Sequence, residues 1–137
     1  MKDDLKAILK EKGYSLTKPR RQVFELLQNQ EPQGMQVIVK RAEGLVDRAT
    51  VYRTIELFEK LGIVNRLNIG WKYKIELSDI FTEHHHHFNC TNCARTYKLK
   101  ANPMLETMID SVASQKGFSP RSHQLEVSGL CPNCRAA

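Results

Sequence analysis

The stretch that organises this chain is residues 84–93, which read His84-His85-His86-His87-Phe88-Asn89-Cys90-Thr91-Asn92-Cys93. In an extended strand, consecutive side chains point to opposite faces. The first and third histidines then share one face and the second and fourth share the other, so one strand can serve two metal sites. The Cys-x-x-Cys pair that follows can supply half of a third site, a tetrahedral zinc.

The cysteines of the chain form two Cys-x-x-Cys pairs, Cys90 with Cys93 and Cys131 with Cys134. Four thiolates are the set that Zn²⁺ prefers in closed structural sites. The pairs lie farther apart than in a compact zinc ribbon, so such a site would hold the end of the chain onto the histidine-rich strand. Disulfides are the alternative, but the two short pairs and the charged start without an export signal favour zinc. A redox-switching role for zinc-bound thiolates stays open.

Length and composition are those of a folded globular protein, with 137 residues, 41% hydrophobic and 26% charged. No apolar run is long enough for a transmembrane helix or a signal peptide, so we expect a cytoplasmic protein with no membrane contact. The net charge of +6 lies in the first half, because residues 1–75 hold 15 Lys/Arg and 9 Asp/Glu whereas residues 76–137 hold six of each. All histidines and cysteines lie in the second half. This division predicts a basic module for a polyanion and a neutral module for metal, although a mild positive charge can also simply aid solubility.

The first half reads as helices followed by a β-hairpin. Thr17 and Asp47 are good N-cap residues, and Gly13, Gly44 and Gly62 are suited to the ends of helices. Apolar residues at helical spacing predict four helices, in residues 3–13, 17–29, 33–44 and 47–61. Residues 63–77 then alternate as a hairpin with a turn at Asn68-Ile69-Gly70. Helices followed by a basic hairpin describe a winged helix-turn-helix, in which the fourth helix enters the DNA major groove and the hairpin, the wing, touches the backbone.

Candidate DNA-binding side chains lie on three parts of this half. A basic group begins the second helix, donors lie at the amino-terminal outward positions of the fourth helix, and further cations lie on the wing. Arginine and tyrosine on a helix surface are often only a solvated face, but here charge, helix order and wing agree. The candidates are Lys18, Arg20, Arg48, Thr50, Tyr52, Arg53 and Lys72, with Arg66 and Lys74 as further contacts on the wing.

The second half reads as a small α/β unit. Asn102 and Pro103 begin a helix that Gly117 closes, and residues 121–130 alternate as a strand. In this helix Leu105, Met108, Ile109 and Val112 are expected to face inward. The fold class is therefore α+β, with a winged-helix domain in residues 1–78 and a metal-binding dimerisation domain in residues 79–137. A unit of this size buries little core, so bound metal and a partner subunit are its expected supports.

Several motifs together resemble those of the ferric uptake regulator (Fur) superfamily of metal-dependent repressors. The resemblance covers nearly the whole chain. It rests on Asp47-Arg48-Ala49-Thr50-Val51-Tyr52-Arg53-Thr54, on Tyr73-x-x-Glu76-Leu77, on the histidine-rich strand leading into Cys-x-x-Cys, on His123 and on the terminal Cys-x-x-Cys. The resemblance implies a homodimer with an amino-terminal winged helix, a carboxy-terminal dimerisation domain, a structural zinc and a regulatory metal.

Carried over by position, the resemblance implies three metal sites. The structural zinc takes Cys90, Cys93, Cys131 and Cys134. A site in the dimerisation domain takes His84, His86, Glu106 and His123. A hinge site takes Glu76, His85 and His87.

The chain departs from the family pattern in three places. The hinge site usually also takes a histidine from the winged-helix domain, but no histidine precedes His84, so that Gln30 or Glu31 is left as the substitute. A carboxylate usually found five residues after the first Cys-x-x-Cys is here Lys98, which cannot ligate when protonated. His86 stands where the family often has Asp, which makes that site richer in nitrogen and favours zinc, nickel or cobalt over manganese.

The leading hypothesis is a metal-responsive regulator, expected to be a repressor, that binds palindromic operator DNA as a dimer. Its metals would be a structural Zn²⁺ and a second divalent ion, Zn²⁺, Fe²⁺, Mn²⁺ or Ni²⁺, as effector. A peroxide sensor that uses bound Fe²⁺ and a constitutive DNA-binding protein with purely structural zinc are the alternatives. We expect no enzyme, because no HExxH motif or paired acid and base accompanies the histidines and a hydrolase gives no reason for the basic winged helix.

Overall fold

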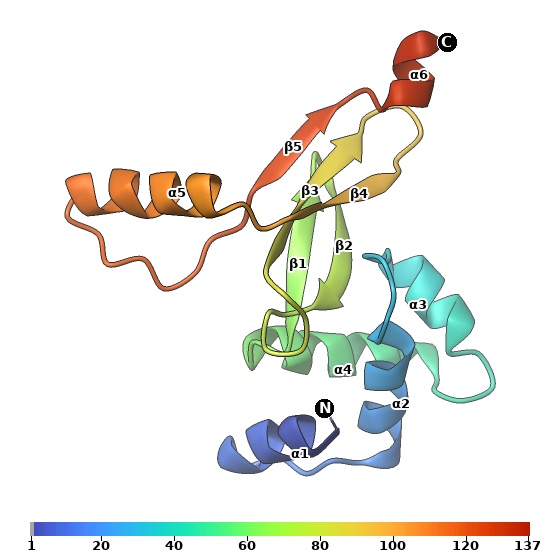
Figure 1. Cartoon of the computed structure of the whole chain (residues 1–137). Coiled ribbons are helices and arrows are strands. Elements are labelled where there is room, and N and C mark those ends of the chain that lie inside the picture. Colours follow the sequence, from blue (N-terminus) through green and yellow to red (C-terminus); the bar gives the residue numbers. More distant parts are fainter. Residues whose placement is uncertain (1) are drawn as a thin grey trace. The chain divides into compact units, whose positions relative to one another are not determined.

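The computed structural model describes residues 2–137, which form two compact units that divide between Glu83 and His84 (Figure 1). The sequence placed the domain limit a few residues earlier, after Ser78. Phe81 gives the physical reason for the difference, since it packs against the core of the first unit with its ring centroid 5.0 Å from that of Phe24. In residues 2–137 we find no helix that is both long enough and apolar enough to cross a membrane.

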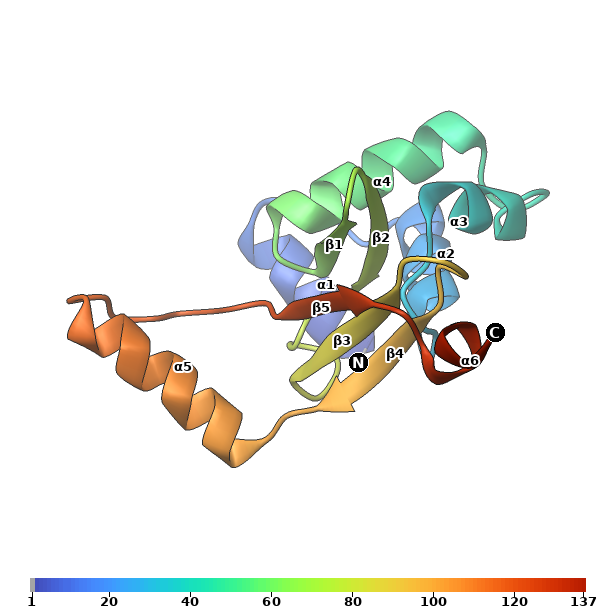
Figure 2. The ribbon, with the colours of Figure 1, turned by 90° about the horizontal axis from the view of Figure 1, so that it is seen from above.

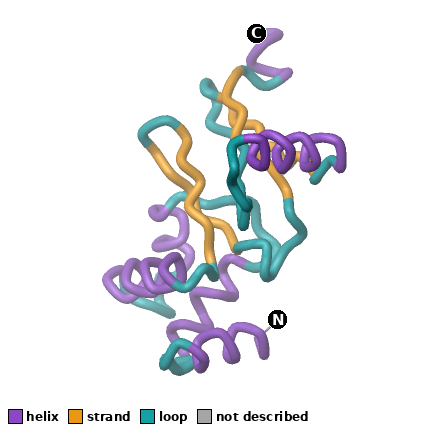
Figure 3. The backbone as a smooth tube through the Cα atoms, turned by 90° about the vertical axis from the view of Figure 1, so that its left-hand side faces the viewer, coloured by secondary structure: helices purple, strands orange, loops and turns teal. Residues whose placement is uncertain are grey.

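The first unit contains four helices and a two-stranded hairpin, the order expected of a winged helix. In Figure 3 the hairpin strands, in orange, rise above the purple helices of this unit. Its elements are α1 (Lys2–Glu11), α2 (Lys18–Leu27), α3 (Met35–Arg41), α4 (Arg48–Lys60), β1 (Val64–Ile69) and β2 (Lys72–Leu77). Both predicted N-caps are confirmed: Thr17 Oγ1 accepts from the Arg20 N–H at 3.4 Å, and the Asp47 carboxylate accepts from the Thr50 N–H at 3.2 Å.

An apolar core holds this first unit together. Phe24 and Phe58 are its largest fully buried side chains, and α4 contributes a stripe of buried residues at helical spacing. The stripe consists of Val51, Thr54, Ile55 and Phe58. Because the inner face of α4 is fixed in this way, its outer face is presented to solvent in one orientation.

The turn of the wing lies one residue later than the sequence indicated. Ile69 pairs with Lys72 in the β1–β2 ladder, so the loop is the two residues Gly70 and Trp71. Gly70 has φ +64, a conformation that glycine adopts without the strain a side chain would cause. A positive φ at the first central residue alone is the pattern of a type II′ hairpin turn, which fits the twist of the strands.

The second unit is a three-stranded sheet with one long helix and one short helix. The strands are β3 (His85–Cys90), β4 (Thr96–Lys100) and β5 (Glu126–Gly129), in the order β4-β3-β5, with β3 antiparallel to β4 and parallel to β5. Helix α5 (Pro103–Gln115) connects β4 to β5, and α6 (Pro132–Ala136), which the sequence analysis missed, ends the chain. The histidine-rich strand is thus the central strand of its sheet.

The interior of the second unit is polar. Within residues 84–137 the buried side chains are His86, His87, Asn89, Cys90, Thr96 and Cys131. Helix α5 buries none of its residues and extends away from the sheet of its own unit (Figure 2). The expectation that Met108 and Val112 face inward is therefore wrong, because they are 62% and 55% exposed. This unit has no apolar core of its own on which the helix could pack.

Candidate metal centres and nucleic-acid interface

The four cysteines converge, although 38 residues separate Cys93 from Cys131 in the chain. All four are free thiols, and their sulfur atoms lie within 4.8 Å of one another, with 3.9 Å between Cys93 Sγ and Cys131 Sγ. A tetrahedral zinc with Zn–S bonds of about 2.3 Å needs sulfurs about 3.8 Å apart. The spacing of this cluster therefore fits Zn²⁺, and the free thiols give no support to the disulfide alternative.

Local hydrogen bonds stabilise the thiolate form of part of this cluster. The backbone N–H groups of Cys93 and Cys131 lie 3.5 Å and 3.4 Å from Cys90 Sγ, and they lower the pKa of the Cys90 thiol to about 6. Asn92 Nδ2 donates to Cys134 Sγ at 3.3 Å, which favours the thiolate of Cys134. The Cys131 side chain, burial and the other sulfurs outweigh that bond and raise the pKa of Cys134 to about 11. Without a cation the cluster thus resists carrying four negative charges, and a dication removes that resistance.

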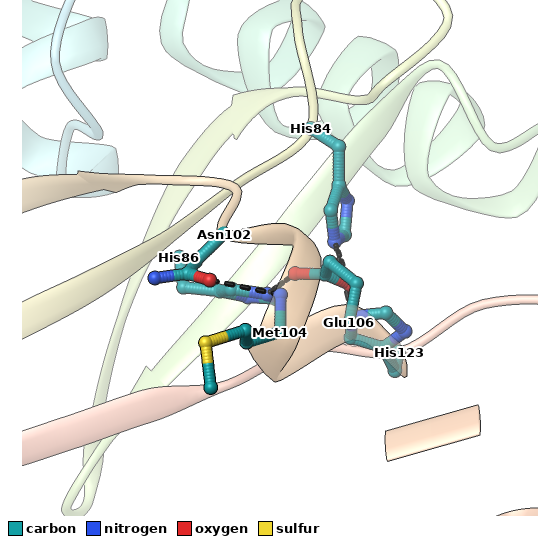
Figure 4. Close-up of polar contacts among 6 residues, drawn as sticks. All are labelled: His84, His86, Asn102, Met104, Glu106 and His123. Carbon is teal, nitrogen blue, oxygen red and sulfur yellow. Dashed lines mark hydrogen bonds and ion pairs between the residues drawn. The ribbon is translucent and has the colours of Figure 1, made fainter. Parts of the chain in front are cut away.

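A second cluster forms where β3, α5 and the segment before β5 meet (Figure 4). The carboxylate of Glu106 stands among three imidazole Nε2 atoms, at 2.6 Å from His86, 2.6 Å from His123 and 3.2 Å from His84. The Nε2 atoms of His84 and His123 are 3.0 Å apart. Four potential ligand atoms therefore converge on one point from segments that are distant in the sequence.

The first turn of α5 places Glu106 in this cluster. Asn102 caps the helix by accepting from the Met104 N–H at 2.9 Å, and Pro103 begins it, so Glu106 projects from a fixed position (Figure 4). Burial alone would raise the pKa of Glu106, but the hydrogen bond with His86 and the charges of the neighbouring histidines hold the pKa below its ordinary value. The carboxylate is therefore ionised and able to bind a cation at neutral pH.

The buried His86 ring bears on whether this cluster suits a metal. His86 is 1% exposed, and its Nδ1 atom has no hydrogen-bond partner among residues 2–137. The other ring nitrogen, Nε2, is the one that has a partner, and it faces the Glu106 carboxylate. The one nitrogen of this buried imidazole that has a partner, Nε2, faces the other three side chains of the cluster, which suits it to bind a divalent ion. Three nitrogens with one carboxylate are a ligand set that Zn²⁺ accepts.

The hinge set, Glu76, His85 and His87, draws its members from both units, and it stays a prediction. Within the second unit, the rings of His85 and His87 lie together with centroids 4.7 Å apart, as strand alternation predicts. Lys98 lies directly opposite His87 in the β3–β4 ladder. Cross-strand neighbours of this kind share one face of the sheet, so the ammonium group disfavours a further cation beside His87.

Sequence analysis missed a buried polar network around Glu126. Glu126 Oε1 lies 2.8 Å from His87 Nδ1, its Oε2 accepts from Asn89 Nδ2 at 2.6 Å, and Thr96 Oγ1 donates to Asn89 Oδ1 at 2.9 Å. An ionised carboxylate only accepts hydrogen bonds, so His87 donates to Glu126 from Nδ1. Glu126 is the only acidic residue of residues 121–130, and that was the signal that could have identified it.

Tyr97 is the other missed residue. The Cys134 backbone N–H and, after it, the Tyr97 hydroxyl donate hydrogen bonds to the Cys131 sulfur and lower the pKa of that thiol. Donors to a thiolate of this kind tune a metal site without binding the metal. No spacing rule connects Tyr97 to Cys131, and only the pairing of β4 and β3 brings the tyrosine near the cysteines.

The predicted DNA-binding residues lie on α2, α4 and β2 of the first unit. Arg48, Tyr52 and Arg53 are exposed along the outer face of α4, with the Arg48 guanidinium 5.4 Å from the centroid of the Tyr52 ring. Arg53 Nη2 donates to Thr50 Oγ1 at 3.3 Å. The remaining candidates are Lys18, Arg20 and Lys72, of which Arg20 is partly engaged, because its Nη1 donates to the Ser15 carbonyl at 2.7 Å.

A basic winged helix followed by a unit with two clusters of metal-ligand side chains defines a metal-binding transcription regulator. Comparison with known proteins agrees. The profile of the ferric uptake regulator family matches residues 11–128. The ferric uptake regulation protein of Yersinia pestis is 33% identical over 143 residues, which cover 98% of this chain and 94% of that protein. The corresponding protein of Synechococcus elongatus is 30% identical over 142 residues, with 96% and 92% covered.

Solved structures show the same fold. The iron-containing structure of the ferric uptake regulator from Francisella tularensis has a TM-score of 0.74 and 25% identity, and it covers 90% of this chain and 96% of that chain. The chain belongs to the ferric uptake regulator family, and it is a metal-responsive regulator of that family.

The thiol pKa values predict that zinc binding to the cysteine cluster releases protons. Ligating sulfurs must be deprotonated, and Cys134 is protonated at neutral pH without metal. Zinc added to chelated protein at about pH 7 should therefore acidify a weakly buffered solution, and zinc affinity should fall as the pH is lowered towards about 6. Competition with a chromophoric chelator at several pH values measures this. Cys134→Ser should weaken binding, and an affinity independent of pH would contradict the assignment.

The Glu126 network predicts a measurable contribution to stability. Glu126→Ala leaves the buried His87 and Asn89 donors without their carboxylate, which should lower the free energy of unfolding of the zinc-loaded protein by about 1–3 kcal/mol. Urea denaturation followed by circular dichroism measures the change. Asp110→Ala, which removes an exposed carboxylate from α5, is the control and should stay within about 0.5 kcal/mol. Equal stabilities of the two variants would rule out the network as a support.

Proposed function

We propose that this protein is a homodimeric repressor that binds palindromic operator DNA when its histidine cluster holds a divalent metal. The cysteine cluster holds a structural zinc that stays in place. The histidine cluster, formed by His84, His86, Glu106 and His123, holds the exchangeable effector. The observation that carries this proposal is the convergence of three imidazole nitrogens on the ionised Glu106 carboxylate within one unit.

The composition of the histidine cluster supports a preference among metals. Three neutral imidazoles and one carboxylate suit Zn²⁺, Co²⁺ or Ni²⁺ better than Mn²⁺, which favours oxygen ligands. His86 contributes the third nitrogen from a fully buried position. The effector is therefore expected to be a nitrogen-preferring ion, with Zn²⁺ the first to test.

Strand β3 gives a physical reason why metal in one cluster affects the whole unit. It carries His86 of the effector cluster and ends at Cys90 of the zinc cluster, and it is the central strand of the sheet. A metal at the histidine cluster also ties α5 to β3 through Glu106. The bound ion thus favours one arrangement of the dimer, in which both α4 helices match their half-sites.

The open face of α5 supports the homodimer. Met104, Met108 and Val112 follow one another at helical spacing and are 79%, 62% and 55% exposed. An apolar stripe that its own unit leaves uncovered is typical of a protein–protein interface. A second copy of the same helix, related by a twofold axis, would cover the stripe with an identical stripe and place two recognition helices symmetrically.

Metal dependence is tested with a duplex that the wild-type protein selects from a random pool in the presence of zinc. Chelation that spares the cysteine-bound zinc should weaken binding to this duplex by about tenfold or more in a mobility-shift titration, and zinc should restore it. Glu106→Ala should bind weakly with or without metal, since it removes the carboxylate on which three histidines converge. Asp110→Ala, one turn later on α5, is the matched control and should behave as wild type. If duplex binding does not change on chelation or on addition of any divalent metal, the protein is a constitutive DNA-binding protein instead.

The assignment of α4 as the recognition helix is tested separately. Tyr52→Ala and Arg53→Ala remove exposed donors from its outer face and should each weaken binding to the selected duplex by about tenfold, whereas zinc content and dimer mass stay unchanged. Lys60→Ala, at the far end of the same helix, removes one exposed charge as the matched control and should weaken duplex binding much less. Fluorescence anisotropy with labelled duplex, zinc analysis and sedimentation measure the three quantities. Wild-type affinity in both α4 variants would assign DNA recognition to another surface.

A further inference from the structure

The tip of the wing presents a tryptophan that the DNA-binding residues assigned so far do not include. Trp71 is the only tryptophan of the chain, and it is 90% exposed. Farther from the turn, Leu67 and Ile75 are 1% and 0% exposed, and Ile75 belongs to the core of the first unit. The tryptophan therefore contributes nothing to the core. A polar residue at this turn would make the protein more soluble than an exposed tryptophan does.

The turn presents Trp71 in a defined position. The β1–β2 ladder runs without interruption from Val64 and Leu77 to Ile69 and Lys72, so only Gly70 and Trp71 lie outside it. A two-residue hairpin turn has little conformational freedom. An aromatic side chain with two rotatable bonds on a tight turn loses little entropy when it is immobilised by a partner.

The surroundings of Trp71 are cationic. From Arg66 to Lys74 the hairpin carries three basic residues and no acidic one. Lys72 is exposed, and its Nζ lies 5.0 Å from the centroid of the Trp71 ring. Arg66 forms an ion pair with Glu59, with 3.0 Å between Nη2 and Oε2. Lys72, which directly follows Trp71, is therefore the cation considered at the tip. An aromatic ring beside an exposed ammonium group matches a polyanion that also offers flat apolar surfaces, which is the chemistry of a nucleic acid.

A protein partner fits this tip less well than DNA does. Along the hairpin, Trp71 is the one large apolar side chain that is mostly exposed, and Asn68 beside the turn is polar and exposed. Protein-docking surfaces are contiguous apolar patches, whereas a single ring among cations is not. The turn also points toward the side of the first unit along which α4 lies (Figure 2). A duplex held on the outer face of α4 would therefore lie on the side of the first unit toward which the turn points.

We propose that Trp71 inserts into the DNA minor groove beside the major-groove site of α4, with Lys72 binding the adjacent phosphate. This inference rests on the proposed DNA-binding function and adds a second, aromatic contact to it. The minor groove is about 6 Å wide, so a ring can enter edge-on and pack against deoxyribose and base edges. Apolar side chains that enter this groove act as wedges between base steps, and they favour flexible A·T-rich steps.

The single tryptophan allows the contact to be read directly in the wild-type protein. The probe is the duplex selected from a random pool in the presence of zinc, added to full-length zinc-loaded protein. Trp71 emission should shift or be quenched at the same duplex concentration that shifts the protein in a gel. The quenching constant for acrylamide should fall several-fold in the complex, because the ring leaves the solvent.

Variants then separate the ring from the charge. Trp71→Ala should lower affinity for the selected duplex about tenfold, as expected for the loss of one aromatic contact to nucleic acid, and Trp71→Phe should recover most of it. Lys72→Ala should reduce the slope of log affinity against log salt by about one, which Trp71→Ala should leave unchanged. Hydroxyl-radical footprinting should show minor-groove protection next to the α4 contact that disappears in Trp71→Ala alone.

The outcomes distinguish this inference from the function on which it rests. If the wild type binds the duplex while Trp71 stays equally accessible to acrylamide, the inference is overturned and DNA binding stands. The same holds if Trp71→Ala changes the dimer mass in sedimentation but leaves duplex affinity intact, since the ring would then belong to a protein interface. A wild-type protein that selects no duplex overturns both. The acrylamide measurement needs no substitution, so it decides even if Trp71→Ala fails to fold.

Discussion

Ligand-type side chains, not apolar ones, meet in the interior of the second unit. Two histidines, two cysteines, an asparagine and a threonine fill the buried positions of residues 84–137, and helix α5 buries nothing. Such groups are costly to bury unless they are paired or bind a cation. The convergence of three imidazoles on Glu106, and of four sulfurs at the end of the chain, is therefore what this unit offers in place of a hydrophobic core. A cation bound at these clusters would add its binding free energy to the stability of the unit.

The first unit has the opposite character. Its core is apolar, its helices are capped by side chains, and the outer face of α4 and the tip of the wing are held in place without any cation. One chain therefore joins an apolar, stably packed unit that carries the candidate DNA-binding residues to a unit whose interior consists of metal-ligand side chains. Strand β3 is central to the second unit, since it carries His86 of the histidine cluster, ends at Cys90 of the cysteine cluster and is held by the Glu126 network.

Sequence patterns predicted the helices and hairpin of the first unit well, because interactions between residues close in the sequence determine them. Thr17 and Asp47 cap the helices they were expected to cap, and the inward stripe of α4 follows its helical spacing. One failure arises because a pattern of apolar residues does not say what will cover them. The stripe of α5 has the right period and was assigned to the interior, yet Met108 and Val112 face solvent because the chain supplies nothing to pack on them. Glu126 and Tyr97 were missed because their partners are distant in the sequence, on β3 for Glu126 and just after β5 for Tyr97.

The sequence by itself determined which chemistry this protein carries: the ligand types, their alternation on one strand, the two cysteine pairs, and the confinement of the excess positive charge to one half. These properties are local, so spacing alone reveals them. Only the tertiary structure decided which distant groups meet. It brought Glu106 and His123 to the same face of β3, gave the buried His87 and Asn89 side chains the Glu126 carboxylate as a partner, and placed Trp71 in the turn at the tip of the wing. Strand pairing and helix capping set those contacts across long stretches of chain, and no short-range pattern encodes them.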